Sequence, residues 1–254
     1  HALGHQEVYL RISLEIALKK LMVGGLTRVY EIGKVFRNEG IDRSHNPEFT
    51  LLEAYAAYWD YNDMMAFVEN LFEKVTLELH GTTELPFGKE GTEGYRVINM
   101  KTPWPRMTMK ESIRKYTGIN IDDLSDDEIR AKLVETGRID EGKIMSAPRG
   151  ILLSSFFEER VEHRLLDPRH ITDHPIETTP LCKPHRNPAE RKNGIVERFE
   201  SFIMGQEICN AYSELNDPEI QRDLLLQQAE RKEAGDEEAN PLDEEFLEAI
   251  CQGM

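Results

Sequence analysis

The chain has 254 residues, of which 39% are hydrophobic and 31% charged, and its formal net charge is −16. This length is enough for one large domain, or for a domain with a subdomain, and for a sizeable core. The acidic balance argues against a non-specific nucleic-acid binder, because such binding comes mainly from neutralising phosphates. Contact with RNA through one local patch stays open.

The sequence predicts neither a membrane span nor a disulfide framework. No apolar run approaches the ~20 residues that cross a bilayer. The cysteines Cys182, Cys209 and Cys251 are scattered and form no CxxC pair, which also argues against a zinc ribbon. We therefore expect a cytoplasmic protein without a membrane partner.

The first predicted helix covers residues 14–22, where apolar residues recur with helical spacing. This pattern puts Lys19 and Lys20 on the polar side, and a pair of glycines ends the helix. Glu15 is open to two interpretations, a solvated helix residue or a ligand-binding carboxylate.

Residues 28–58 predict a long antiparallel hairpin. Alternating β-formers lead to Phe36, a turn-rich loop follows, and a second extended run covers 49–55. Charged side chains lie in or beside these apolar strands, namely Arg37, Glu39, Arg43, His45, Glu48 and Glu53. Since an unpaired buried charge is costly, these charges indicate a binding surface, and a bound polyanion would explain them.

After the hairpin, helices are predicted at 61–79, 109–116, 126–135 and 150–165. Asp60, Thr108 and the SDDE run are the predicted N-terminal caps of the first three. One strand is predicted at 95–98. We expect 109–165 to be an inserted helical subdomain.

Residues 166–188 contain three histidines in a segment broken by prolines: His170, His174 and His185. Their spacing matches no common zinc pattern, so structural or loop histidines are the favoured interpretation over a metal site. Pro168 and Pro175 bracket a predicted short strand.

Residues 195–212 predict a second hairpin that turns at Gly205. Glu200 and Glu207 lie on facing positions if the turn falls at 204–206. Two carboxylates so placed repel unless a divalent cation or a shared proton lies between them, and Mg²⁺ suits a site that also holds polyphosphate. Two separately solvated glutamates are the alternative.

Asn210, Tyr212 and Glu214 alternate on one face of this second hairpin. An amide, a phenol and a carboxylate suit a small zwitterion with an additional positive charge. Two helices are predicted to follow, at 218–234 and 243–251.

Several motifs resemble those of one enzyme family. FRNEG at 36–40, HNPEF at 45–49 and LLEAY at 51–55 resemble motif 2 of class II lysyl-tRNA synthetases. ERFESFIMGQEICNAYSELNDP at 197–218 is similar to the metal- and lysine-binding hairpin of that family, and segments 10–25 and 170–181 also match it. The resemblance covers most of the chain and is weakest between about 82 and 148.

The resemblance implies an α+β fold, with an antiparallel sheet of the class II aminoacyl-tRNA synthetase type flanked by helices. It divides the catalytic core into a first part at 1–108 and a second part at 166–254, around the helical insertion at 109–165. The implied activity is ATP-dependent conversion of L-lysine to lysyl-adenylate and its transfer to tRNA(Lys), with Mg²⁺ as cofactor and a homodimer in the full-length enzyme.

The resemblance also implies individual roles. Arg37 is the implied catalytic residue, because it bridges the α-phosphate and the lysine carboxylate. The other implied ATP contacts are Glu39 at the adenine amino group, Phe49 on the ring, His45 and Asn46 near the outer phosphates, and the Mg²⁺ ligands Glu200 and Glu207. The other implied lysine contacts are Glu15 at the α-amino group, Asn210 at the carboxylate, Glu53, Tyr55 and Glu214 at the ε-ammonium group, and Tyr212.

The sequence departs from the family pattern in what it lacks: motif 1, motif 3 and the anticodon-binding OB domain. We therefore expect a central piece of the catalytic domain. Two alternatives stay open. One is a lysyl ligase that modifies a protein, although such enzymes usually have a glycine between the asparagine and glutamate of FRNEG. The other is a non-catalytic paralogue that retains the lysine pocket.

Overall fold

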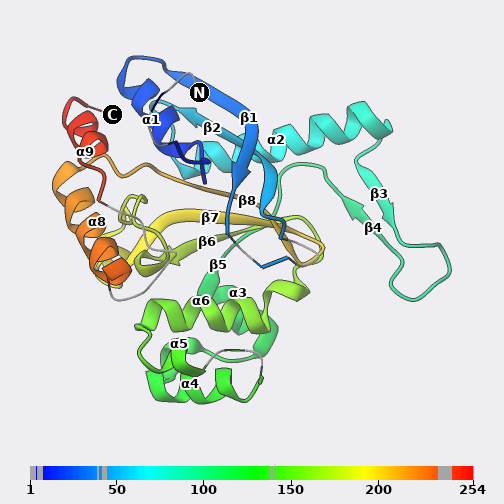
Figure 1. The fold of residues 1–254 in the computed structure, drawn as a ribbon. Helices are drawn as coiled ribbons and strands as arrows, with labels where there is room; N and C mark the ends of the chain where they lie inside the picture. Colours follow the sequence, from blue (N-terminus) through cyan, green and yellow to red (C-terminus); the bar gives the residue numbers. More distant parts are fainter. Residues whose placement is uncertain are drawn as a thin grey trace. The chain divides into compact units, whose positions relative to one another are not determined.

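The computed structural model describes residue 4 and residues 8–38, 40–41, 45–137, 139, 141–233 and 242–253. The chain splits into two compact units, one of His1–Tyr58 with Asn216–Met254 and the other of Trp59–Leu215 (Figure 1). Each unit is described by itself. No helix within the described ranges is both long and apolar enough to cross a membrane.

In its described residues, the first unit contains the hairpin of β1 (Arg28–Phe36) and β2 (Glu48–Ala56) and the helices α1 (Glu15–Val23), α8 (Pro218–Glu233) and α9 (Glu244–Cys251). The strands pair antiparallel from Arg28 opposite Ala56 to Phe36 opposite Glu48, which confirms the first predicted hairpin. One face of the hairpin packs on α1 around Leu14, Leu18 and Val35.

Lys19 corrects one prediction for this unit. Its residue surface is only 1% exposed, so it does not lie on a solvated side of α1. Its Nζ lies 2.5 Å from Glu15 Oε1 and 5.8 Å from the ring centroid of Phe246 on α9. The helical spacing predicted a solvated position for Lys19, but α9, more than 200 residues later in the chain, covers this side of α1.

The second unit is built around a four-stranded sheet with the order β5-β6-β7-β8. Its elements are α2 (Tyr61–His80), β3 (Glu84–Phe87), β4 (Arg96–Asn99), β5 (Arg106–Thr108), α3 (Met109–Thr117), α4 (Asp126–Val134), α5 (Glu141–Met145), α6 (Arg149–Arg160), β6 (Arg169–Pro175), α7 (Pro188–Lys192), β7 (Ile195–Ile203) and β8 (Gln206–Tyr212). Strands β6, β7 and β8 pair antiparallel, in agreement with the predicted antiparallel sheet, whereas β5 joins β6 in parallel at one edge.

Helix starts in the second unit follow the predicted caps. The side chains of Asp60, Thr108 and Ser125 accept hydrogen bonds from the backbone amides of the first turns of α2, α3 and α4. In each case a reciprocal bond completes a capping box, which satisfies backbone donors that the helix itself cannot. These contacts confirm where the three helices begin.

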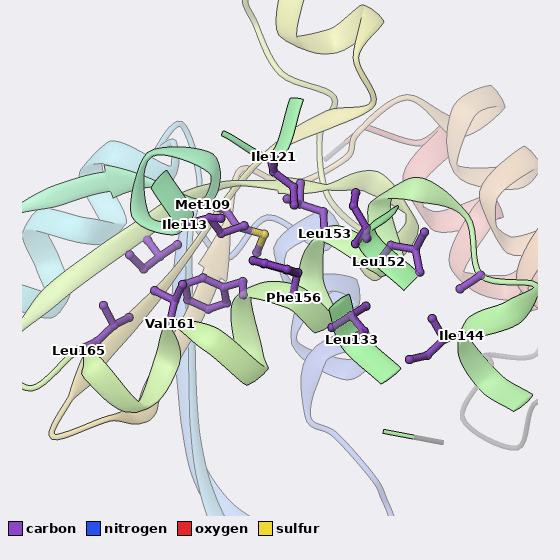
Figure 2. Packing of buried hydrophobic residues seen from close by; sticks show 14 of the residues in the cluster. Met109, Ile113, Ile121, Leu133, Ile144, Leu152, Leu153, Phe156, Val161 and Leu165 are labelled. Atoms are coloured by element: carbon purple, nitrogen blue, oxygen red, sulfur yellow. The ribbon is translucent and has the colours of Figure 1, made fainter. Parts of the chain in front are cut away.

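The largest buried cluster joins the helices of 109–165 to the sheet (Figure 2). Side chains of α3, α4 and α6, among them Met109, Leu133 and Phe156, point into one apolar interior. Ile171 on β6 and Phe202 on β7 belong to the same cluster. The helices therefore share their core with the sheet, and the division into a separate subdomain stays a prediction.

All three histidines, His170, His174 and His185, are buried in this unit. His170 Nδ1 lies 2.9 Å from Ser201 Oγ and its Nε2 lies 3.1 Å from Glu69 Oε1. Burial lowers the pKa of His170 to about 3, with a further contribution from the charge of Arg106. Burial likewise lowers the pKa of His174 to about 3, so both imidazoles are neutral and structural, as predicted.

Candidate functional site

The hairpin of β7 and β8 carries a cluster of polar side chains on one face. Its strands are joined by Met204 and Gly205, both with positive φ, which matches the right-handed twist of the strands. Phe202 pairs with Glu207, but Ser201 pairs with Cys209, so one extra residue bulges from β8. The sequence predicted that Glu207 faces Glu200 directly, and this prediction is wrong, because Glu207 pairs with Phe202 instead.

The bulge nevertheless brings the predicted residues to one face. Glu200 pairs with Asn210 and lies two residues from Phe202, whose partner is Glu207. Because cross-strand partners project to the same side of a sheet, Glu200, Glu207 and Asn210 share a face. In a regular strand, Glu207 and Asn210 would project to opposite sides, since their numbers differ by three, and the bulge is what puts them on the same side.

Arg198 organises this face, and the sequence analysis did not assign it a role. Its guanidinium donates to Glu200 Oε1 at 2.6 Å, to Asn210 Oδ1 at 3.0 Å and to Thr178 Oγ1 at 3.0 Å. A planar fork with several donors can fix two acceptors at once, which a lysine ammonium group cannot do in the same geometry. Its place in the alternating pattern of β7, two residues before Glu200, was the available signal.

The carboxylates of this region have raised pKa values. Burial, and next the charge of Glu200, raise the pKa of Glu207 to about 7. Burial also raises the pKa of Glu200 in spite of the charge of Arg198. Burial, and next the charge of Glu158, raise the pKa of Glu162 to about 7. A divalent cation would relieve the repulsion that accompanies full ionisation of Glu200 and Glu207.

The donor set fits Mg²⁺ better than a tightly caged metal. Within the described part of the chain, no three or more His, Cys, Asp or Glu side chains gather closely enough to hold a metal ion. Mg²⁺ is usually bound by one or two carboxylates together with water and substrate phosphates. The pair Glu200 and Glu207 meets that requirement and would hold the cation.

The segment after β8 is held in place by the Ser213 side chain and by the backbone of Glu214. Ser213 Oγ accepts a hydrogen bond from the amide of Tyr61 at 3.0 Å, and Glu214 forms an isolated antiparallel bridge with Cys182. Tyr212 pairs with Arg198 and so projects to the face of Asn210. Glu214 is half-buried, with one carboxylate oxygen fully enclosed.

In the first unit, Glu53 and Tyr55 form a hydrogen-bonded pair. The Tyr55 hydroxyl donates to Glu53 Oε2 at 2.9 Å, while Glu53 Oε1 accepts from Ser13 Oγ at 2.9 Å and from the amide of Leu14 at 3.0 Å. Glu53 thus also connects β2 to the start of α1, a structural role that the sequence did not indicate.

The loop end of the first hairpin brings Arg37 to Phe49. The Arg37 guanidinium lies 5.2 Å from the Phe49 ring centroid, and its Nε donates to the carbonyl of Ile12 at 3.2 Å. The Asn46 amide donates to the backbone carbonyl of Glu48 at 2.7 Å, and His45 lies beside it in the chain. Glu39, predicted at adenine, lies outside the described residues.

Glu15 is neither solvated nor isolated. Its side chain is 18% exposed and forms the ion pair with Lys19, and its backbone amide donates to Ser13 Oγ at 3.1 Å. The structure thus gathers Arg37 with Phe49, and Glu15 near Ser13 and Glu53, in the first unit. In the second unit it gathers Glu200, Glu207, Asn210 and Tyr212.

Comparison with known proteins gives one consistent result. The family model for tRNA synthetases class II (D, K and N) matches residues 1–254. Proteins named "Lysine--tRNA ligase" are similar to the chain: the one from Chlamydia pneumoniae is 55% identical over 252 residues, and the one from Saccharolobus solfataricus is 44% identical over 250 residues. Each alignment covers 98% of this chain but 47% and 48% of the relative, so the chain spans about half the length of these curated relatives.

Proposed function

Because this chain belongs to the class II tRNA synthetase family of the D, K and N enzymes, we propose that it serves lysyl-tRNA synthesis. In this proposal, ATP activates L-lysine as lysyl-adenylate, and the lysyl group is transferred to tRNA(Lys). The observation that carries the proposal is the polar face of β7 and β8, where Arg198 orders Glu200 and Asn210. The name shared by the relatives supports lysine as the amino acid.

Lysine recognition needs acceptors for two ammonium groups and donors for one carboxylate. We assign the α-amino group to Glu15 and the carboxylate to Asn210, aided by Arg37. We assign the ε-ammonium group to Glu53, Tyr55 and Glu214, with Tyr212 as a further lysine contact. A shorter or neutral side chain would not make the charge-assisted contact with the half-buried Glu214 carboxylate, which is a strong basis for discrimination.

Arg37 is the residue we assign to the reacting phosphate. A guanidinium there neutralises charge that develops as the lysine carboxylate attacks the α-phosphate. Phe49, now under the Arg37 guanidinium, offers its ring to adenine, with Glu39 at the adenine amino group. His45 and Asn46 are assigned to the outer phosphates. No covalent intermediate with the protein is needed, because positioning and charge stabilisation carry the reaction.

Glu200 and Glu207 are the proposed holders of Mg²⁺. When bound, the cation supplies positive charge that offsets the charge of the phosphates. Arg198 keeps the Glu200 carboxylate oriented through its 2.6 Å contact. We further propose a homodimer and a cytoplasmic location for the protein that carries this chain.

The decisive experiment is ATP–pyrophosphate exchange by the protein that carries this chain, with each amino acid in turn. We expect exchange that depends on L-lysine and Mg²⁺, followed by lysylation of tRNA(Lys). Exchange with another amino acid, or none with any, would contradict the proposal. Exchange with lysine but no charging of tRNA would indicate a different lysyl acceptor.

A further inference from the structure

One part of the second unit has a charge opposite to that of the chain. Between residues 96 and 117 there are six basic residues, Arg96, Lys101, Arg106, Lys110, Arg114 and Lys115, and one acidic residue, Glu111. The whole chain has a formal net charge of −16, so this segment is locally positive in an acidic protein. A polyanion would be repelled by most of the surface and attracted here.

Three of these basic residues line one groove. This groove is a shallow, open depression of about 540 Å³, and it is lined by Arg106, Met107, Glu111, Arg114 and Lys115. Arg106 is on β5, and Arg114 and Lys115 are in the last turn of α3, so two elements supply the charge. The three basic residues are exposed to solvent.

The local contacts leave much of this positive charge available. Among the described residues, Arg114 and Lys115 form no ion pair, and Lys115 Nζ lies 5.5 Å from the Tyr116 ring centroid. Arg106 forms an ion pair with the buried Glu69 at 3.6 Å and donates to Asn62 Oδ1 at 3.4 Å, while 40% of its side chain stays exposed to solvent. Glu111, the acid in the lining, accepts from the backbone amide of Thr108 in the α3 cap.

Helix stabilisation alone does not account for the groove. Basic residues in the last turn of a helix interact favourably with its dipole, which would explain Arg114 and Lys115. It does not explain Arg106, which precedes the helix and lines the same groove. Several cations on one concave surface are the usual footprint of phosphate contacts, since phosphate contacts provide most of the affinity for nucleic acid.

We propose that Arg106, Arg114 and Lys115 bind backbone phosphates of the tRNA substrate. The proposal rests on the proposed function, which supplies the RNA, and it identifies how an acidic chain holds a polyanion. Inorganic phosphate shares the ligand chemistry, so the experiment must separate the two.

The test compares three variants of the protein that carries this chain. Arg114→Gln/Lys115→Gln removes two charges, and Arg114→Lys/Lys115→Arg keeps them. The matched control, Lys74→Gln/Lys192→Gln, removes two exposed lysines from α2 and α7, outside the groove lining. The dissociation constant for tRNA(Lys) is measured between about 50 mM and about 200 mM salt. Melting temperature and lysine-dependent exchange, which needs no tRNA, check folding and the active site.

For Arg114→Gln/Lys115→Gln we expect binding at least about tenfold weaker at the lowest salt, and a log–log salt slope smaller by about two units. The charge-retaining variant and the control should match the parent, and all should retain exchange. Equal affinity and slope in the first variant and the control would overturn the proposal. So would loss of inorganic phosphate binding alone with tRNA binding unchanged. Absence of exchange in the parent would instead contradict the proposed function.

Discussion

The Arg198 guanidinium lies 2.6 Å from Glu200 Oε1, and both side chains project from the same face of β7. The pair is nearly enclosed, with 12% of the Arg198 side chain and 13% of the Glu200 side chain exposed. Burial still raises the pKa of Glu200, so the arginine offsets the desolvation of this carboxylate only in part. A ligand cation would complete the compensation.

Replacing Arg198 by lysine should therefore impair the reaction more than it impairs folding. A lysine cannot hold Glu200, Asn210 and Thr178 together, so these groups lose their fixed positions. We expect the rate of lysine-dependent exchange to fall by about 10²-fold, with a higher Mg²⁺ requirement. Arg222→Lys, in the exposed pair of Arg222 with Glu244, is the control and should be nearly silent. Equal activity of both variants would remove Arg198 from the site.

Glu214→Gln tests the assignment of the ε-ammonium group. Loss of a charge-assisted hydrogen bond costs about 1.5–3 kcal/mol, which corresponds to about a 10- to 100-fold rise in the KM for lysine. The KM for ATP should stay within about twofold. Exposed Glu219, at the start of α8, gives the control Glu219→Gln. If the two KM values of Glu214→Gln rise together, the assignment is wrong.

Lys19→Met should destabilise the protein, although the apolar stem is kept beside Phe246. The substitution leaves the half-buried Glu15 carboxylate without the ammonium group that lies 2.5 Å away. We expect a loss of about 2–4 kcal/mol in the free energy of unfolding, measured in urea. Adding Glu15→Gln should recover much of it, because the uncompensated charge disappears. Additive losses in the double variant would show that the ion pair is not the cause.

Glu162 predicts a pH dependence of stability. Its pKa of about 7 in the folded chain lies above the usual 4.5, so between these pH values the folded state binds more protons than the unfolded state. The stabilisation is complete below pH 4.5 and is lost as the pH rises through 7. The free energy of unfolding of Glu162→Gln, relative to that of the parent, should therefore rise by about 1–2 kcal/mol from about pH 5 to about pH 8. This range is discounted for solvent screening.

Urea titrations at both pH values measure this gain, and Glu159→Gln in the last turn of α6 is the control. The stability of Glu162→Gln should still fall in part as the pH rises, because burial raises the pKa of Glu207 to about 7 as well. Parallel pH profiles for parent and Glu162→Gln would contradict the prediction.

The sequence predicted the features that local signals specify. Asp60, Thr108 and the serine before α4 began helices where expected, because a cap acts within three residues. Both hairpins were found from alternating side chains, because strands that are adjacent in the chain usually pair.

The features it missed depend on residues distant in the chain. His170 contacts Glu69 across 101 positions, and β5 pairs with β6 in parallel after an intervening set of helices. Lys19 is buried by α9 for the same kind of reason. Arg198 was visible in the alternating pattern, but two of its three acceptors, Asn210 and Thr178, lie outside β7, and only the folded structure brings them beside it.

The extra residue in β8 has a consequence for how this segment can change in evolution. Loops usually tolerate insertions and deletions, but the interval between Glu207 and Asn210 is counted in single residues, because each step reverses the side of the sheet. Losing one residue there would remove the bulge and still leave Glu207 and Asn210 on one side, because residues two apart in a regular strand share a face. Gaining one would turn Glu207 away from Glu200, so this hairpin should lose a residue at this point more readily than it gains one.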